Sequence, residues 1–206
     1  MNSWRKQHDL ENRFVVIFAG TQGYNQDIDI ILRAAQRLIN CHNISFIIIG
    51  DGNQHENMLT KSIEMNLYNV KWLAWQPRDQ YPLVLHTADV IIATLKKEVS
   101  TPVVPSKILS AMSAGRPIIA CMPSKGDAPE LIRETGAGIV LPPGNDLALA
   151  GAIDLLFRNH DIGKQMGKNG RKYVEKYLDV NIWAKKYIGL FSELLQNSRR
   201  QEKGKG

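Results

Sequence analysis

Short apolar runs alternate with amphipathic stretches along most of the chain. Residues 14–18 are apolar without a break, and residues 45–49 repeat this pattern after an initial serine, just before the turn 50–52. Strands that are apolar on both faces are typical of a parallel sheet covered by helices. Between the two runs the apolar residues have helical spacing, at Ile28, Ile31, Leu32, Ala35 and Leu38.

The alternation continues to residue 157. We expect further strands at 70–73, 90–93, 117–120 and 138–140, and helices at 54–65, 78–87, 106–114, around Glu130, and at 147–157. The chain after residue 157 is expected to be all helix. Strands and helices in alternation form right-handed crossover units, so the prediction is an α/β fold, a single doubly wound Rossmann-like domain with a parallel sheet of about six strands.

The pattern divides the chain into a polar N-terminal segment (1–12), the α/β domain (13–178), a terminal helix (179–196) and a basic tail (197–206). The terminal helix carries one apolar stripe, formed by Val180, Trp183, Ala184, Tyr187, Phe191, Leu194 and Leu195. Large aromatic side chains need a surface that buries them. That surface is either this domain or a partner outside the chain, and the stripe alone fits both.

Composition and charge narrow the function classes. The 206 residues are 44% apolar and 22% charged, and no apolar run approaches the roughly eighteen residues that cross a bilayer. The net charge is +6, but the basic residues collect toward the C-terminus instead of forming a patch with aromatics, so no nucleic-acid partner is expected. They form a solvated helix face or attract the chain weakly to an anionic membrane surface. Two cysteines and no secretory leader favour a cytoplasmic protein, with peripheral placement at the inner face of the membrane as an option.

The first candidate site is the loop of Gly20, Thr21 and Gly23, between a strand and a helix. In an open parallel sheet, ligands bind beyond the carboxyl ends of the strands. Glycines there let backbone N–H groups approach phosphate oxygens. A tight structural turn fits the same residues.

The second candidate is the helix start formed by Val104, Pro105, Ser106 and Lys107. Proline suits the first turn of a helix, and the first N–H groups, the serine hydroxyl and the lysine charge would together hold a diphosphate. A plain capped helix with a solvated lysine is the alternative.

Other polar groups carry less weight. Asp27 and Asp29 resemble a metal-binding pair, but they open a helix, where residues two apart face different directions. The five histidines have no ligand spacing, and nothing beside Cys121 marks it as a nucleophile. We therefore expect no metal and no cofactor.

Several motifs together resemble the C-terminal half of the family-4 retaining GT-B glycosyltransferases, over about residues 14–195. They are Gly20-x-x-Gly23, Ile49-Gly50-Asp51-Gly52, Ala88-Asp89-Val90, Val104-Pro105-Ser106-Lys107, the run 111–120, the run 136–144 and Met166-Gly167-Lys168-Asn169-Gly170-Arg171. The Val-Pro-Ser-Lys form is similar to bacterial enzymes that assemble polysaccharides, O-antigens and capsules.

The resemblance implies a nucleotide-sugar donor such as a UDP-sugar, with its diphosphate between the glycine loop and the helix start. The base would lie against the backbone near Trp75, Gln76 and Pro77, and the ribose near Ser110. Transfer would be retaining and metal-independent, to a polysaccharide or lipid-linked acceptor. A GT-B enzyme has two such domains, so the implied partner is an N-terminal domain in the same or another chain, on which the terminal helix docks. Without that half the chain is expected to be inactive.

Three departures from the family pattern stand out. Pro102 and Ser110 occupy the positions of two glutamates, the second of which normally holds the ribose, and Thr21 and Gln26 replace an arginine and a lysine common on the first loop. Because Ser110 replaces the ribose-binding glutamate, a non-catalytic module that binds nucleotide-sugars is an alternative function. Asp51, at the end of the second strand, could hold a ribose, so a dinucleotide-binding domain of an oxidoreductase is a further alternative, although the G-x-G-x-x-G fingerprint is missing.

Overall fold

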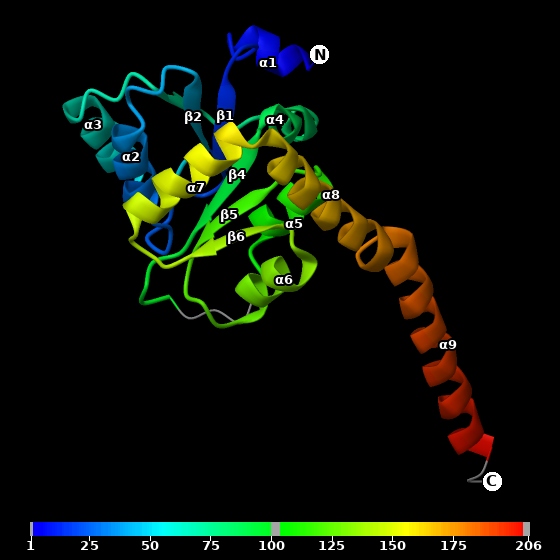
Figure 1. Cartoon of the computed structure of the whole chain (residues 1–206). Coiled ribbons are helices and arrows are strands. Elements are labelled where there is room, and N and C mark those ends of the chain that lie inside the picture. The colour runs from blue at the N-terminus through cyan, green and yellow to red at the C-terminus, as the bar shows by residue number, and fades with distance from the viewer. Residues whose placement is uncertain (1, 100–103, 204–206) are drawn as a thin grey trace.

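A computed structural model describes residues 2–99 and 104–203 (Figure 1). Within them, six parallel strands form one sheet in the order β3-β2-β1-β4-β5-β6. The strands are β1 (Phe14–Ala19), β2 (Ile44–Ile49), β3 (Val70–Leu73), β4 (Val90–Thr94), β5 (Ile118–Cys121) and β6 (Gly138–Leu141). This is the doubly wound order, with its switch point between β1 and β4, and it confirms the predicted fold class.

Helices cover both faces of the sheet. One face packs against α2 (Ile28–Arg37), α3 (His55–Glu64) and α7 (Asp146–Arg158). The other packs against α1 (Ser3–Gln7), α4 (Tyr81–Thr87), α5 (Ser106–Ser113) and α6 (Asp127–Thr135). A further helix, α8 (His160–Tyr177), lies over α5, and α9 (Val180–Lys203) follows it.

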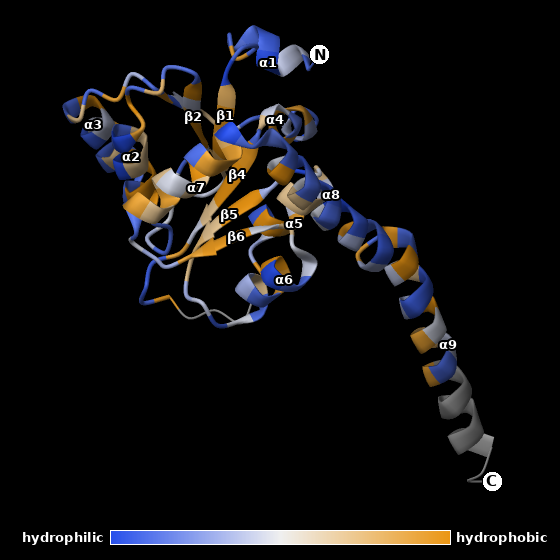
Figure 2. Ribbon diagram, in the orientation of Figure 1, coloured by the Kyte–Doolittle hydropathy of each residue, from blue (hydrophilic) through white to orange (hydrophobic). Residues whose placement is uncertain are grey.

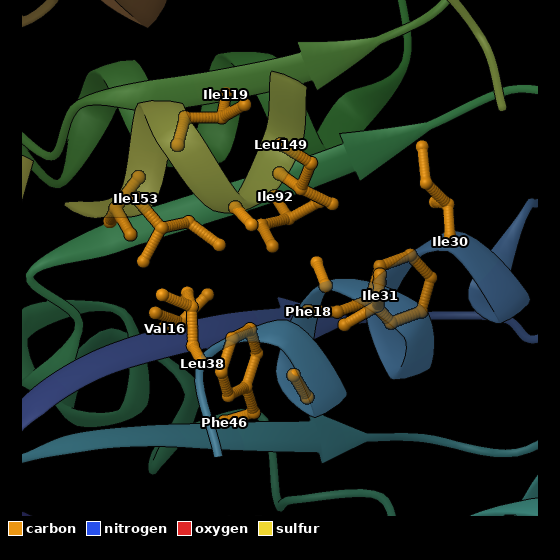
Figure 3. Close-up of a cluster of buried hydrophobic side chains, with 14 of the residues drawn as sticks. Val16, Phe18, Ile30, Ile31, Leu38, Phe46, Ile92, Ile119, Leu149 and Ile153 are labelled. Carbon is orange, nitrogen blue, oxygen red and sulfur yellow. The ribbon is translucent and has the colours of Figure 1, made fainter. Parts of the chain in front are cut away.

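The central strand β1 explains why the first run is wholly apolar. Val16 and Phe18 point to the face covered by α2 and α7, whereas Val15 and Ile17 point to the face covered by α4 and α5. Figure 3 shows the first of these two cores, where Phe18 meets side chains of α2 and Ile153 of α7 lies over the sheet. Both faces of the strand are therefore shielded from solvent, as is typical of a parallel sheet.

Two glycines of α8 explain the motif of residues 166–171. A Cβ on Gly167 would collide with the Gly115 carbonyl, and one on Gly170 would lie 3.1 Å from Met112 Cγ. These glycines let α8 approach the end of α5 closely, so that helix closes the second core from outside.

Most predicted bounds agree with the structure within a residue or two, but the prediction for α4 was wrong at its start. The helix begins at Tyr81 instead of residue 78, because the N–H groups of Gln80 and Tyr81 both donate to the Pro77 carbonyl in a turn, and Pro82 occupies the first helical turn. The last helical stretch is also divided, at Leu178 and Asp179, into α8 and α9.

The segment 1–12, which reads as polar, contributes two side chains to the second core. Trp4 is 2% exposed and Leu10 is 4% exposed. Their signal in the sequence is slight, since each is a single apolar residue among charged neighbours.

The terminal helix α9 leaves the body of the molecule and runs away from the sheet (Figure 1). Apolar and polar residues are mixed along the coloured part of its ribbon (Figure 2), and Trp183, Tyr187 and Phe191 are 42%, 55% and 58% exposed. The stripe, as far as Leu194, is not buried by this domain; Leu195 and the tail 197–206 lie outside the side chains described. No helix within the described residues combines the length and apolarity needed to cross a membrane.

Candidate functional site

The switch point of the sheet brings the two predicted phosphate segments together. Gly20 directly follows β1, and its φ of 136° is a conformation that residues with a side chain rarely adopt. A Cβ on the neighbouring Gly50 would collide with the Gly20 carbonyl. The loops after β1 and β2 therefore touch through their backbones, and glycine is required at both positions.

Lys107 lies directly over this backbone. A Cβ on Gly20 would be 2.7 Å from Lys107 Cε and 2.8 Å from Lys107 Nζ, and the ammonium stands 5.0 Å from the centre of the Phe18 ring. Burial lowers the pKa of Lys107. None of the ion pairs among the described residues includes this lysine. A partly desolvated cation without a carboxylate, held over a glycine backbone, is a site for an anion.

The loop after β1 is held in place by Gln22, which sequence reasoning missed. This side chain is fully buried, and its amide donates to the Gly50 carbonyl at 2.9 Å. Its amide oxygen lies 3.0 Å from His55 Nδ1, and its backbone N–H donates to the Asp51 carbonyl at 2.8 Å. The only signal in the sequence was a polar residue between two glycines, which reads as solvent-exposed.

These bonds leave part of the loop free. Within the described chain, the N–H groups of Thr21 and Gly23 have no hydrogen-bond acceptor, and Thr21 is exposed. The loop is thus rigid before any ligand binds, and two of its donors remain available for phosphate oxygens.

Among the residues that the structure describes, no side chain caps the start of α5. Pro105 is the N-cap residue and accepts from the Ile108 N–H at 2.9 Å, while Ser106 is exposed at the first helical position. Ser106 is therefore exposed next to the partly buried Lys107 at the first turn of the helix.

The three residues predicted to bind the base all lie in the loop after β3, but their side chains have different surroundings. Trp75 is 54% exposed and lines a cavity of about 410 Å³ together with Gly50, Asp51 and His55. Gln76 instead turns inward, where its amide oxygen accepts from the Trp4 indole at 3.2 Å. Pro77 is exposed and begins the turn into α4.

Ser110 opens into a second cavity, of about 450 Å³, that also contains Ser106 and Tyr81. No carboxylate lines this cavity within the described residues. Burial raises the pKa of Tyr81, and a hydrogen bond between its phenol and the Ser110 hydroxyl opposes that rise. The cavity, which His86 and Arg171 also line, therefore presents hydroxyl groups and one guanidinium next to the helix start.

The discounted groups have structural roles. Asp27 caps α2 by accepting from the Ile30 N–H, and Asp29 pairs with Arg33 and Lys61. Cys121 is buried. In the described part of the chain, no three His, Cys, Asp or Glu side chains come together as metal ligands. Pro102, which occupies the other position where the family usually has a glutamate, lies outside the described residues.

The family of glycosyl transferases group 1 matches residues 1–173. The chain belongs to this family. A probable glycosyltransferase of Pseudomonas aeruginosa, WbjE, is 32% identical over 146 residues, which cover 71% of this chain and 36% of that protein. The putative colanic acid biosynthesis glycosyl transferase WcaI of Escherichia coli is 23% identical, over 91% of this chain and 46% of its own length.

The solved structure of Anabaena HepE in complex with UDP-glucose has the same fold. It superimposes with a TM-score of 0.79 at 21% identity, covering 93% of this chain and 52% of HepE. The chain therefore spans between about a third and a half of the length of these proteins. Family membership favours a glycosyltransferase over the oxidoreductase alternative.

Proposed function

We propose that this chain is the donor-binding half of a retaining GT-B glycosyltransferase and that its donor is a UDP-sugar. The observation that carries the proposal is the Lys107 ammonium, held over the Gly20 backbone at the switch point without a carboxylate partner among the described residues. HepE, which shares this fold, was solved in complex with UDP-glucose, and this supports the choice of nucleotide.

In this proposal the diphosphate lies between the loop of Gly20–Gly23 and the start of α5. The free N–H groups of Thr21 and Gly23, the Ser106 hydroxyl and Lys107 surround its oxygens. When the bond between the sugar carbon and the diphosphate oxygen breaks, the electron pair leaves with UDP. Fixed donors and one ammonium stabilise that charge, so transfer proceeds without a metal.

The nucleoside extends from the helix start into the cavity of Ser110 and Tyr81. Their paired hydroxyls face the ribose and replace the carboxylate that the family pattern expects at position 110. The base then reaches the loop after β3, next to the exposed Trp75.

The acceptor requires the half of the enzyme that this chain does not span. We place an N-terminal domain across the cleft, in the same or another chain, with α9 docked on it by the stripe of Trp183, Tyr187 and Phe191. A growing bacterial polysaccharide or its lipid-linked precursor is the proposed acceptor, as the name of WcaI supports. Such an acceptor would place the enzyme in the cytoplasm, at the inner face of the membrane.

Calorimetric titration tests the donor proposal. UDP is expected to bind this chain equally well in EDTA and in buffer with Mg²⁺, and NAD is expected to bind much more weakly. Loss of UDP binding in EDTA would refute the metal-free site, and preference for NAD would refute the donor class.

Ser110 also supports one second candidate, a non-catalytic module that binds nucleotide-sugars. Transfer activity of a two-domain protein that contains this chain decides between them. Turnover of UDP-sugar by that protein supports the enzyme, and tight binding without turnover supports the module.

A further inference from the structure

We propose that Trp4 is a positioning residue for the nucleotide-binding loop and acts on that loop through Gln76. The inference rests on the proposed function, because that function places the base of the nucleotide next to the loop of residues 74–77. It assigns a role in the donor site to the segment that precedes the sheet.

The contact between the two residues is specific. The Trp4 ring is 2% exposed, and its indole N–H donates to the Gln76 amide oxygen at 3.2 Å. The amide nitrogen of Gln76 donates in turn to the Ala74 carbonyl at 3.0 Å. The Gln76 side chain therefore bonds both to the backbone of its own loop and to helix α1.

Helix α1 is only five residues long, but it is firmly anchored. The Asn2 amide donates to the Leu83 carbonyl at 2.6 Å and to the Thr87 hydroxyl at 2.9 Å, both in α4. The Arg5 guanidinium donates to the Thr87 carbonyl at 3.0 Å and pairs with Asp89 at 3.1 Å. The indole of Trp4 thus has a fixed position from which to hold Gln76.

Asp89 extends this anchor to the sheet. Its carboxylate also accepts from the Val15 N–H at 2.7 Å, at the start of the central strand. The chain of contacts runs from the amino end of β1, through Arg5 and Trp4, to the loop at the carboxyl end of β3. Two ends of the sheet are coupled by one short helix.

The loop itself has little other support. Residues 74–77 belong to no helix or strand, and Ala74, Trp75 and Pro77 are all exposed. Because Gln76 is held inward, Trp75 faces the cavity that it shares with Gly50 and Asp51. Without the Gln76 contact the loop would sample more conformations. Ordering the loop on binding would then cost conformational entropy and weaken the affinity for the ligand.

The phosphate site is formed by different elements, the loop after β1 and the start of α5. Loss of the Trp4 contact should therefore weaken ligands that carry a base and leave inorganic pyrophosphate unaffected. A purely structural role of Trp4 would weaken both ligands in proportion to unfolding.

A double-mutant cycle with Trp4→Phe and Gln76→Met tests the inference. Phenylalanine keeps an aromatic ring in the core but has no N–H, and methionine keeps the length of glutamine without its amide. Dissociation constants for UDP and for inorganic pyrophosphate are measured by calorimetry on the full chain. Each single variant should weaken UDP about three- to tenfold, the range expected for one lost hydrogen bond. The double variant should be no weaker than the weaker-binding single variant, and pyrophosphate affinity should stay within about twofold.

Tyr68→Phe is the matched control, because its hydroxyl also donates a hydrogen bond, to the Ile39 carbonyl at 2.7 Å, but ahead of β3 and not in the loop that follows it. It should leave both affinities unchanged. If Trp4→Phe does not fold, Gln76→Met alone still tests the contact, since it alters no residue of the core.

The outcomes separate this inference from the proposed function. Wild-type chain that binds pyrophosphate but not UDP overturns both. If the wild-type chain binds UDP, two results overturn the role of Trp4 only. One is that the effects of the two substitutions on UDP affinity add up in the double variant, and the other is that UDP and pyrophosphate affinities fall equally.

Discussion

At the scale of single residues, the proposed donor site depends on a lysine whose burial is unfavourable on its own. Lys107 loses hydration in the folded protein, which lowers its pKa, and among the described residues no carboxylate compensates it. A bound diphosphate would supply the missing negative charge. The cost in stability is then recovered when the ligand binds.

Lys107→Ala should weaken UDP binding by about 1.5–3 kcal/mol, the range for a hydrogen bond to a charged group, or roughly ten- to a hundredfold in affinity. Lys97→Ala is the control, because Lys97 is exposed in the loop after β4. Titration of both variants with UDP measures the difference. Equal affinities would show that Lys107 does not contact the diphosphate.

Cys121 provides a second test at this scale. Burial, with a smaller contribution from Asp27, raises the pKa of its thiol to about 12. A raised pKa keeps the thiol protonated below that pH, and only the thiolate reacts rapidly. At pH 8 iodoacetamide should therefore modify the half-buried Cys41 well before Cys121, as read by mass spectrometry of the peptides. In denaturant the two cysteines should react alike; faster reaction of Cys121 in the folded chain would contradict its burial.

At the scale of elements, the packing of α8 on α5 depends on the absence of side chains. Gly167→Ala would drive a methyl group into the Gly115 carbonyl, which cannot move without the turn that ends α5. Overpacking of this kind costs about 1–3 kcal/mol, which lowers the melting temperature by several degrees in a chain of this size.

Gly151→Ala in α7 is the matched control. Its Cβ would meet nothing within 4 Å, and the position is exposed. Alanine is the better helix former by up to about 1 kcal/mol, so this variant should melt at the same or a higher temperature. Thermal unfolding followed by circular dichroism compares the two, and equal melting temperatures would show that α8 does not need glycine at the contact.

At the scale of the whole molecule, α9 is the element without a partner in the described chain. Truncation after Asp179 removes the exposed stripe but keeps Tyr177, which packs on Tyr173 within α8. The melting temperature should change by only a few degrees, because none of the described side chains of α9, which reach as far as Leu194, belongs to either core. Sedimentation should show less self-association, since an exposed apolar patch has been removed.

A fall of tens of degrees after truncation would mean that α9 folds back on this domain in solution. In that case the helix belongs to the core and is not a docking element.

Most of the architecture could be predicted from the pattern of residues. The unbroken run in β1 and the helical spacing of Ile28, Ile31 and Leu32 are local signals, because strands buried on both faces and helices buried on one face need these patterns wherever they occur. The same holds for the glycines after β1 and β2. The fold class, the strands and the two phosphate segments are all consequences of such signals.

The rest depended on contacts between residues distant in sequence. Burial of Gln22 is possible only because the backbone of residues 50 and 51 and the ring of His55 satisfy its hydrogen bonds. Trp4 becomes a core residue only because α4 passes beside it, and Gln76 turns inward only because Trp4 is there. A polar or isolated residue has no local pattern that reveals such a partner.

The sequence by itself thus determined the doubly wound sheet and the two segments at its carboxyl edge where the phosphate site is proposed, since each follows from short-range periodicity and backbone chemistry. Only the tertiary structure decided that Lys107 lies over Gly20, that Ser110 shares a cavity with Tyr81, and that the terminal stripe is left uncovered by this domain. Those outcomes depend on how elements pack in space, and the free energy of packing is a property of the whole fold.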